Sequence, residues 1–275
     1  MHEVSAKRCA VIGDPATHSL SPAIHRAGYA LHGLDWSYEA LTVPAGGLDE
    51  FLRPLLGDPT WVGLSVTAPH KEAVVAYGDP DEPTRLVGGG NTLVFGGQPR
   101  VHNTDVPGFV AALRAHGIRS VRSATIVGAG ATARSILLAC AAIGVRMVEV
   151  LVRDPVRARR LAELAETLGV ECLVQGLDEL PGRTDLLANT IPASATVTHA
   201  GDWAARTTLV FDVVYDPWPT PLGRAAAALG TTALSGLDLL AGQAVDQFAL
   251  LTGRRVTFDV CRSAAEQELR RRRGV

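Results

Sequence analysis

The sequence predicts an α/β protein built from two domains. Strand-like and helix-like segments alternate through the first hundred residues, and a second alternating series begins with a strand, a glycine turn and a helix at residues 123–144. The chain has 275 residues, whereas a typical domain has about 150. We therefore expect an N-terminal α/β domain over residues 1–107 plus 237–275, with the C-terminal helix returning to it. Residues 108–236 are expected to form a Rossmann-type domain with a doubly wound parallel sheet.

Each expected element of the first domain has a local signal. Residues that alternate between apolar and polar at a period of two indicate strands, and apolar residues spaced at three and four indicate helices. A Gly-Gly-Gln-Pro turn between two apolar runs indicates a hairpin. The expected elements are strands at "RCAVIGD", "WSYEALTV" and "GLSVTA", helices at 22–32, 46–56, Pro107–His116 and Leu237–Thr252, and a hairpin at "NTLVFGGQPRVHNTD".

The second domain shows short apolar strands that alternate with helical segments. This order is typical of a parallel sheet with helices on both faces. After "SATIVGAGATARSILLACAAIG" come "RMVEVLVRD", "RARRLAELAETLG", "DLLANTIP", "TTLVFDVVYDP" and "PLGRAAAALG".

Composition limits the class of function. A formal net charge of -2 gives no overall attraction to nucleic acid or to an anionic membrane, and the basic run "LRRRRGV" is explained as a solvated helix end. The N-terminus shows no signal-like pattern, and no apolar run reaches the roughly 20 residues of a membrane span. We expect a cytoplasmic protein.

The cysteines and histidines do not have the spacing of metal ligands. Four cysteines lie far apart in the chain, so a disulfide framework or zinc site is not expected, and reduced thiols are the simple interpretation. The histidines flank other motifs. The cysteines are Cys9, Cys140, Cys172 and Cys261.

A glycine turn at "VGAGATA" predicts a dinucleotide site. It ends a strand and opens a helix, the context in which such a motif binds a pyrophosphate at the helix N-terminus. Gly128 permits the tight turn and Gly130 permits close approach of the ligand. Ala133 stands at the third glycine position, where alanine is an accepted variant.

Charge after the next strand favours NADP over NAD. NAD-binding folds place an acid near the end of this strand, but Val152 occupies that place here. Arg153 and Arg157 can pair with a 2′-phosphate through their guanidinium groups. Asp154 would repel that phosphate unless its carboxylate points away.

Lys71 follows a strand and Pro69, which favours a helix whose first turn holds His70 and Lys71. The positive end of a helix works against a cation by about 0.3 to 1 kcal/mol. Lys71 therefore either extends into water or has a function.

Small polar residues outside the second domain gather in four segments. Each has an ordinary explanation: Ser19 or Ser21 could cap the next helix, Asn91 could set a turn, and Asp105 could cap a helix. Together with Lys71 they supply hydroxyls, an amide, a carboxylate and a cation, which suits a small polyhydroxylated acid. The segments are "HSLSPAIH", "GLSVTAPHK", "GGGNT" and "HNTDVPG".

An ordered set of motifs resembles the shikimate dehydrogenase family over nearly the whole chain. The motifs are "GDPATHSLSPAIH", "GLSVTAPHK", "NTD..G", "VGAGATAR", "VYDPWPTPL" and "SGLDLLAGQAVDQF". The resemblance implies reversible, NADP-dependent reduction of 3-dehydroshikimate to shikimate in the chorismate pathway to aromatic amino acids. The chain departs from the family pattern at several positions. Asparagine is frequent in the family at the positions of Ser65 and Arg26, and methionine at that of Leu239. Val152 and Asp154, on either side of Arg153, also differ from the family.

The resemblance also implies the site residues. Lys71 and Asp105 form the catalytic pair, in which the formal acid is left open, and Tyr215 is either a residue near the substrate or a buried core tyrosine. The substrate-binding residues are Ser19, Ser21, Ser65, Thr67, Lys71, Asn91, Asp105, Tyr215 and Gln243. The predicted cofactor contacts are Gly128, Ala129, Gly130, Ala131, Thr132, Arg153, Arg157, Thr190, Val213 and Gly236, with no metal.

Other functions stay open at this stage. A related enzyme could oxidise quinate or an aminoshikimate with NAD, and a non-catalytic protein could sense NADP. Methylene-tetrahydrofolate dehydrogenases share a comparable two-domain plan, but "HSLSP" favours a small carboxylate over a folate. The expected partner is a small-molecule substrate, and the expected state is a monomer or homodimer.

Overall fold

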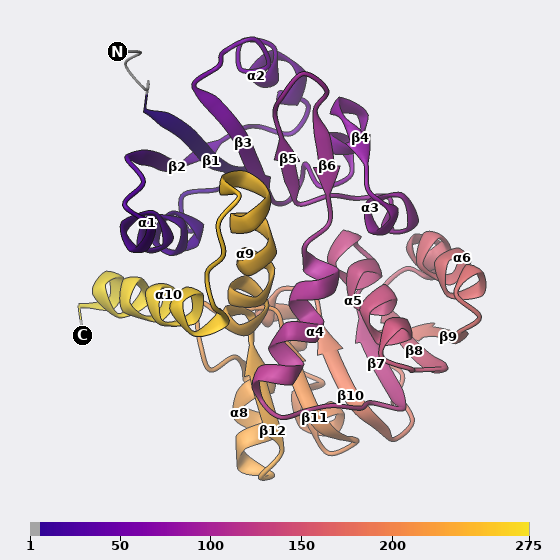
Figure 1. Ribbon diagram of the computed structural model, residues 1–275. Coiled ribbons are helices and arrows are strands. Elements are labelled where there is room, and N and C mark those ends of the chain that lie inside the picture. The colour runs from indigo at the N-terminus through magenta and orange to yellow at the C-terminus, as the bar shows by residue number, and fades with distance from the viewer. Residues whose placement is uncertain (1–5, 275) are drawn as a thin grey trace, which may run out of the picture. The chain divides into compact units, whose positions relative to one another are not determined.

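A computed structural model describes residues 6–274 of the chain (Figure 1). The N-terminal segment in which no signal-like pattern was expected lies mostly outside the described residues. The chain divides into two compact units, one ending at Gly108 and resuming at Leu240, the other spanning Phe109–Leu239. Both divisions fall inside helices, α4 (Asp105–Ala115) and α9 (Gly236–Thr252). Both units are α/β, so the predicted fold class is confirmed.

The first unit contains a six-stranded mixed sheet in the order β2-β1-β3-β5-β6-β4. Strand β1 pairs in parallel with both β2 and β3, and β5 pairs antiparallel with β3 and β6, which confirms the expected hairpin. Parallel neighbours end at the same edge, so the loops after β1 and β3 lie side by side. The strands are β1 (Lys7–Gly13), β2 (Trp36–Thr42), β3 (Trp61–Val66), β4 (Asp79–Pro80), β5 (Thr92–Val94) and β6 (Arg100–His102).

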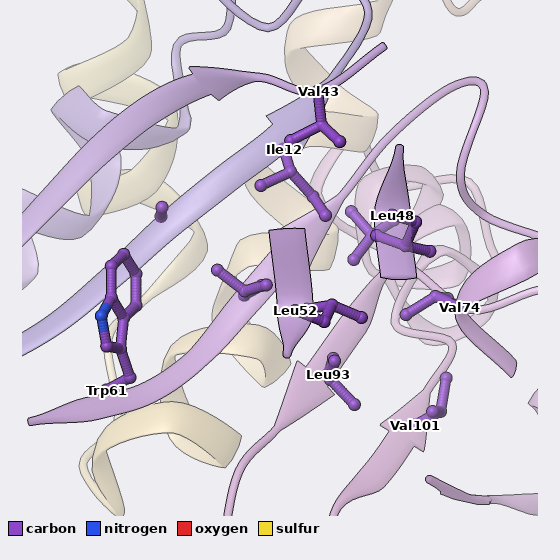
Figure 2. Packing of buried hydrophobic residues seen from close by; sticks show 11 residues of the cluster. Ile12, Val43, Leu48, Leu52, Trp61, Val74, Leu93 and Val101 are labelled. Atoms are coloured by element: carbon purple, nitrogen blue, oxygen red, sulfur yellow. The ribbon is translucent and has the colours of Figure 1, made fainter. Parts of the chain in front are cut away.

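Helices cover this sheet. Its core joins inward residues of the strands, such as Ile12 and Leu93, to Leu48 and Leu52 of α2 and Val74 of η1 (Figure 2). In Figure 1, α10 (yellow) lies beside α1, and the two helices pack together. The C-terminal helix thus returns to the first unit, as predicted. The further helices are α1 (Ser21–His32), α2 (Leu48–Leu52), η1 (Ala73–Tyr77), α3 (Glu82–Val87) and α10 (Phe258–Arg273).

The predicted helix with Lys71 in its first turn is wrong. Residues 69–72 form a turn, and the five-residue 3₁₀ helix η1 begins at Ala73. It is short because the chain becomes extended at Gly78 and then enters β4, where Asp79 N donates to Pro99 O. Lys71 therefore does not lie at an α-helix N-terminus, and the dipole argument for it fails. The helix expected over 46–56 is also shorter, as α2.

The second unit contains a six-stranded parallel sheet in the order β12-β11-β10-β7-β8-β9. The strand order reverses between β7 and β10, which makes this the doubly wound sheet that was predicted. The strands are β7 (Ser123–Val127), β8 (Met147–Val152), β9 (Glu171–Gly176), β10 (Thr184–Asn189), β11 (Thr207–Asp212) and β12 (Thr232–Ser235). The helices are α5 (Ala131–Ala142), η2 (Pro155–Ala158), α6 (Arg159–Thr167), η3 (Ala193–Thr196), α7 (Ala200–Ala204) and α8 (Pro221–Ala228).

Candidate active site

Lys71 and Asp105 form a salt bridge in the first unit. Nζ of Lys71 lies 2.6 Å from Oδ2 of Asp105. Their side chains are 16% and 6% exposed, so the pair is largely shielded from water. Lys71 stands in the turn after β3, and Asp105 is the first residue of α4, after β6. The structure therefore brings the two residues predicted as a catalytic pair into direct contact.

Asn103, rather than Asp105, caps helix α4. Its Oδ1 accepts hydrogen bonds from the backbone N–H groups of Asp105 and Val106 at 3.1 and 3.3 Å, and its Nδ2 donates to Gly89 O at 2.8 Å. The alternative in which Asp105 merely caps a helix is wrong. Because Asn103 satisfies the backbone there, the Asp105 carboxylate is directed to side chains instead.

Asn91 is the centre of a buried polar network around Asp105. Its Nδ2 lies within hydrogen-bond distance of Asp105 Oδ1 (2.9 Å), Thr104 Oγ1 (2.9 Å) and Gln243 Oε1 (3.2 Å). Its Oδ1 accepts from the backbone N–H of Thr104 at 2.8 Å and from the Thr92 hydroxyl at 3.1 Å. The side chain is thus fixed from both ends. Asn91 therefore orients a carboxylate rather than setting a turn.

Close approach of α4 and α9 brings Gln243 to this network. A Cβ on Gly108 would overlap the backbone of Gln243, and a Cβ on Gly242 would overlap the carbonyl of Gly108. Glycine at both positions therefore lets the backbones of the two helices come into close contact. Gln243, predicted from sequence, thereby joins Asn91 and donates its amide to Leu240 O at 3.0 Å.

A second buried network was missed by sequence reasoning. Gln247 accepts from the Ser65 hydroxyl at 2.6 Å and donates to Thr92 Oγ1 at 2.8 Å and Asn91 O at 3.1 Å. The Tyr38 hydroxyl also hydrogen-bonds to Ser65. Gln247 lies four residues after Gln243 on α9, and this helical spacing was the signal that could have identified it. Ser65 is 4% exposed, and two protein side chains already use its hydroxyl.

His25 completes the second network. Its Nε2 lies 3.2 Å from Gln247 Oε1, and its ring stacks on Tyr38 with centroids 4.2 Å apart. The ring is fully buried and its Nδ1 has no hydrogen-bond partner. Burial lowers the pKa of His25 to about 4, and the hydrogen bond to Gln247 only partly opposes this shift. His25 is therefore neutral near pH 7.

Ser19 and Thr67 stand in the loops at the carboxyl ends of β1 and β3, and Ser21 is the first residue of α1, which follows the β1 loop. Thr67 N donates to Ile12 O at 2.9 Å, and Gly13 lies so close to Thr67 that a Cβ would overlap the threonine methyl. The Ser19 hydroxyl accepts from the backbone N–H of Ser21 at 3.2 Å, but the N-cap of α1 is Leu20 and no side chain caps this helix, so the alternative in which Ser19 or Ser21 is a helix cap is wrong. Both loops, with Ser19 and Thr67 on them, share one edge of the sheet.

The glycine turn of the second unit has the geometry of a phosphate-binding turn. Gly128 has φ +104°, a conformation that favours glycine, and a Cβ there would overlap the Thr190 hydroxyl. Gly130 is the N-cap of α5, and a Cβ on it would meet open space. Ala133 is fully buried behind the turn. The first turn of α5, which includes Ala131 and Thr132, therefore directs its backbone N–H groups toward this space.

A groove of about 790 Å³ begins at this turn. Arg153 and Arg157 line it beyond β8. Asp154 also lines it, but its Oδ1 accepts from Val156 N at 3.0 Å as the cap of η2. The carboxylate is thus directed to the backbone, which reduces the expected conflict with a phosphate. Val152, where an acid would favour NAD, is buried.

The remaining predicted residues also belong to the second unit. Thr190 lies against the glycine turn, with its hydroxyl donating to Val127 O at 2.7 Å. Val213 and Gly236 are adjacent, because a Cβ on Gly236 would overlap the Val213 carbonyl. Tyr215 is half-buried, so the alternative of a buried core tyrosine is wrong.

Residues 6–274, which the structure describes, contain neither a metal-binding cluster nor a membrane-spanning helix. Within them, no group of three or more His, Cys, Asp or Glu side chains is placed to hold a metal ion. No helix in this part of the chain has the length and apolar character to cross a membrane.

Burial raises the pKa of the four cysteine thiols, which makes them poorly reactive. The cysteines are Cys9, Cys140, Cys172 and Cys261.

The fold and these two sets of residues define a class: a two-unit α/β protein with a dinucleotide-type glycine turn in one unit and a buried lysine–aspartate pair in the other. Comparison with known proteins then identifies the family. Residues 11–93 match the model of the shikimate dehydrogenase substrate binding domain. The chain is 39% identical to a Methylobacterium radiotolerans protein named shikimate dehydrogenase (NADP(+)), over 92% of this chain and 93% of the relative. The chain belongs to the shikimate dehydrogenase family.

Solved structures agree with this assignment. Shikimate dehydrogenase of Mycobacterium tuberculosis is 34% identical, with a TM-score of 0.86 over 95% of this chain and 99% of that one. Shikimate 5-dehydrogenase of Thermus thermophilus, solved with NADP(H) and shikimate, is 32% identical, with a TM-score of 0.81 over 95% of this chain and 99% of that one. A 5-ketofructose reductase of Gluconobacter is 28% identical, with a TM-score of 0.82 over 96% of this chain and 99% of that one.

Proposed function

We propose that this protein is an NADP-dependent shikimate dehydrogenase, which reduces 3-dehydroshikimate to shikimate reversibly. The observation that carries the proposal is the shielded Lys71–Asp105 pair at 2.6 Å in a chain of this family. Its pathway role is the supply of shikimate for chorismate and the aromatic amino acids. A cytoplasmic location and a monomeric or homodimeric state remain predictions.

The residues of the second unit fit NADP. The turn at Gly128 and Gly130 leaves room where a side chain would intrude, and the N–H groups of α5 suit a pyrophosphate. Arg153 and Arg157 line the same groove and would pair with the 2′-phosphate. Ala129, Ala131, Thr132, Thr190, Val213 and Gly236 are proposed as the further cofactor contacts. When bound, NADPH supplies the hydride for the reaction.

Lys71 holds the proton that the carbonyl oxygen of the substrate needs. Its ammonium group can polarise that carbonyl and donate a proton to it, and in the oxidation of shikimate Lys71 accepts the proton of the 3-hydroxyl. Asp105 fixes the direction of this ammonium group, while Asn91 fixes Asp105. These fixed groups reduce the reorganisation required in the transition state.

The proposed substrate contacts come from one sheet edge and from α9. Ser19 and Ser21 would bind the carboxylate, and Thr67, Asn91, Asp105 and Gln243 would bind ring hydroxyls. Ser65 can offer only the lone pair that its two protein partners leave free. Tyr215 is proposed as a further substrate contact.

Initial rates for shikimate and quinate, each with NADP and with NAD, test the proposal. We expect the highest kcat/KM for shikimate with NADP. A preference for quinate or for NAD would identify the enzyme as one of the alternative dehydrogenases. Absence of turnover in all four assays would favour the non-catalytic NADP sensor and contradict the proposal.

A further inference from the structure

Arg272, at the end of α10, contacts the loop that carries Ser19. Its Nη1 donates to His18 O and its Nη2 to Ser19 O, both at 2.9 Å. The run of four arginines was interpreted from sequence as a solvated helix end. That interpretation is incomplete for this residue, because the exposed Arg272 also bonds a distant loop and its side chain is 32% exposed whereas that of Arg271 is 74% exposed.

The loop between β1 and α1 has little regular structure of its own. His18 is exposed and Ser19 half-buried. Ser19 N donates to Ala16 O at 2.9 Å, its hydroxyl accepts from Ser21 N, and its carbonyl accepts from Arg272. The backbone N–H, the carbonyl and the hydroxyl oxygen of Ser19 thus each have a partner, and the hydroxyl proton can still be donated to a ligand. The guanidinium fork holds two consecutive peptide groups, which sets the direction of the Ser19 side chain between them.

Glu268 orients the guanidinium. Its Oε1 accepts from Arg272 Nε at 2.8 Å, one helical turn earlier on α10. Hydrogen bonds from Arg271 and Arg272 lower the pKa of Glu268 to about 2, so the carboxylate stays charged in any assay near neutral pH. Packing of α10 does not depend on this pair, because Cys261, Ala265 and Leu269 bury its apolar face.

We propose that Arg272 is a positioning residue for substrate binding, which acts by holding the Ser19 loop in the conformation that receives the carboxylate. The proposal rests on the proposed function, since it assumes that Ser19 contacts the substrate carboxylate. Arg272 holds this loop through the backbone carbonyls of His18 and Ser19. Its loss therefore weakens substrate binding and leaves proton transfer at Lys71 in place.

The test compares three variants of the full chain in the oxidation of shikimate by NADP. Arg272→Ala is expected to raise the KM for shikimate about tenfold, with kcat and the KM for NADP nearly unchanged. Arg272→Lys keeps a cationic donor and should recover part of the loss. Arg271→Ala is the matched control, because it removes a partner of the same Glu268 without touching the loop.

The results distinguish failure of the role proposed for Arg272 from failure of the proposed function. If Arg272→Ala lowers the melting temperature but leaves the KM for shikimate at the wild-type value, the residue is only structural and the proposal fails. It fails equally if Arg271→Ala raises the KM as much, or if Arg272→Lys recovers nothing. Absence of shikimate oxidation in the wild-type protein would instead overturn the proposed function on which the inference rests.

Discussion

Asn91 donates a 2.9 Å hydrogen bond to Oδ1 of Asp105, while Lys71 donates a 2.6 Å hydrogen bond to Oδ2 of the same carboxylate. Each oxygen therefore has its own donor, so the carboxylate cannot rotate without breaking one of the two bonds. Asn91 is in turn held by Thr104 and Thr92. The direction of the Lys71 ammonium group is thus determined by residues of β5 and of the segment that leads into α4.

The charge of Asp105 is expected to matter more than its shape. Asp105→Asn keeps the size of the side chain but removes the anion that faces Lys71, so kcat for shikimate oxidation should fall by about 10²-fold or more. Steady-state rates measure this. Asp79→Asn is the control, because its carboxylate is half exposed and pairs with Arg85 at the surface. Equal rates for Asp105→Asn and the wild type would contradict the account.

Gln247 is expected to contribute to stability. Gln247→Leu leaves the buried Nε2 of His25 without its partner and removes one hydrogen bond each from the Ser65 and Thr92 hydroxyls, and an unsatisfied buried group costs about 1 to 3 kcal/mol. The free energy of unfolding should therefore fall by at least about 2 kcal/mol in urea titrations. Gln267→Leu, at an exposed position of α10, is the control. If the free energy of unfolding falls as little as in the control, the hydrogen bonds of Gln247 do not contribute to stability.

His25 is expected to make folding stability depend on pH. Its pKa is about 4 in the folded protein and about 6.5 in the unfolded chain, which therefore binds the proton first as pH falls. Its contribution is fully present above pH 6.5 and decreases toward pH 4, by roughly 3 kcal/mol in total at about 1.4 kcal/mol per unit.

Urea unfolding of the wild type and of His25→Asn at pH 7, 6, 5 and 4.5 measures this effect. The difference in unfolding free energy between the two proteins should shrink as pH falls, because the other histidines contribute equally to both. A difference that is constant with pH would show that His25 does not titrate as described.

Arg153 is expected to select the cofactor. Arg153→Ser should raise the KM for NADP by about tenfold and leave the KM for NAD nearly unchanged, because only NADP carries the phosphate that a guanidinium would bind. Arg159→Ser, an exposed residue that pairs with Glu163, is the control. If Arg153→Ser raises the KM for NADP and the KM for NAD equally, Arg153 does not bind the 2′-phosphate and its proposed role is wrong.

Local patterns were sufficient to predict most of the fold. Strand alternation predicted β1, β2 and β3, and the sequence from β7 through Gly128 and Gly130 to α5 predicted the doubly wound sheet. The helix at Lys71 was wrong because pairing of β4 with β6, a contact distant in sequence, draws the chain into an extended form at Gly78. The sequence pattern around Lys71 carries no information about a contact with residues so distant in the chain.

The polar networks could be predicted only in part. Motifs indicated Lys71, Asp105, Asn91 and Gln243, but Asn103 as the cap of α4 and the links among Tyr38, Ser65 and Gln247 depend on how separate elements pack. Arg272 was assigned to solvent for the same reason. Its partners lie 253 and 254 residues away in the chain, and no pattern near residue 272 indicates them.

The most direct test of the account concerns the two lysines of the chain, Lys7 and Lys71. Lys71→Ala and the control Lys7→Ala, whose Nζ donates to Pro59 O, are assayed for NADPH formation from shikimate and NADP, with shikimate binding measured in parallel. The account predicts that Lys71→Ala loses about 10²-fold or more in turnover while binding stays nearly intact and Lys7→Ala behaves as wild type. Unchanged turnover in Lys71→Ala would contradict it.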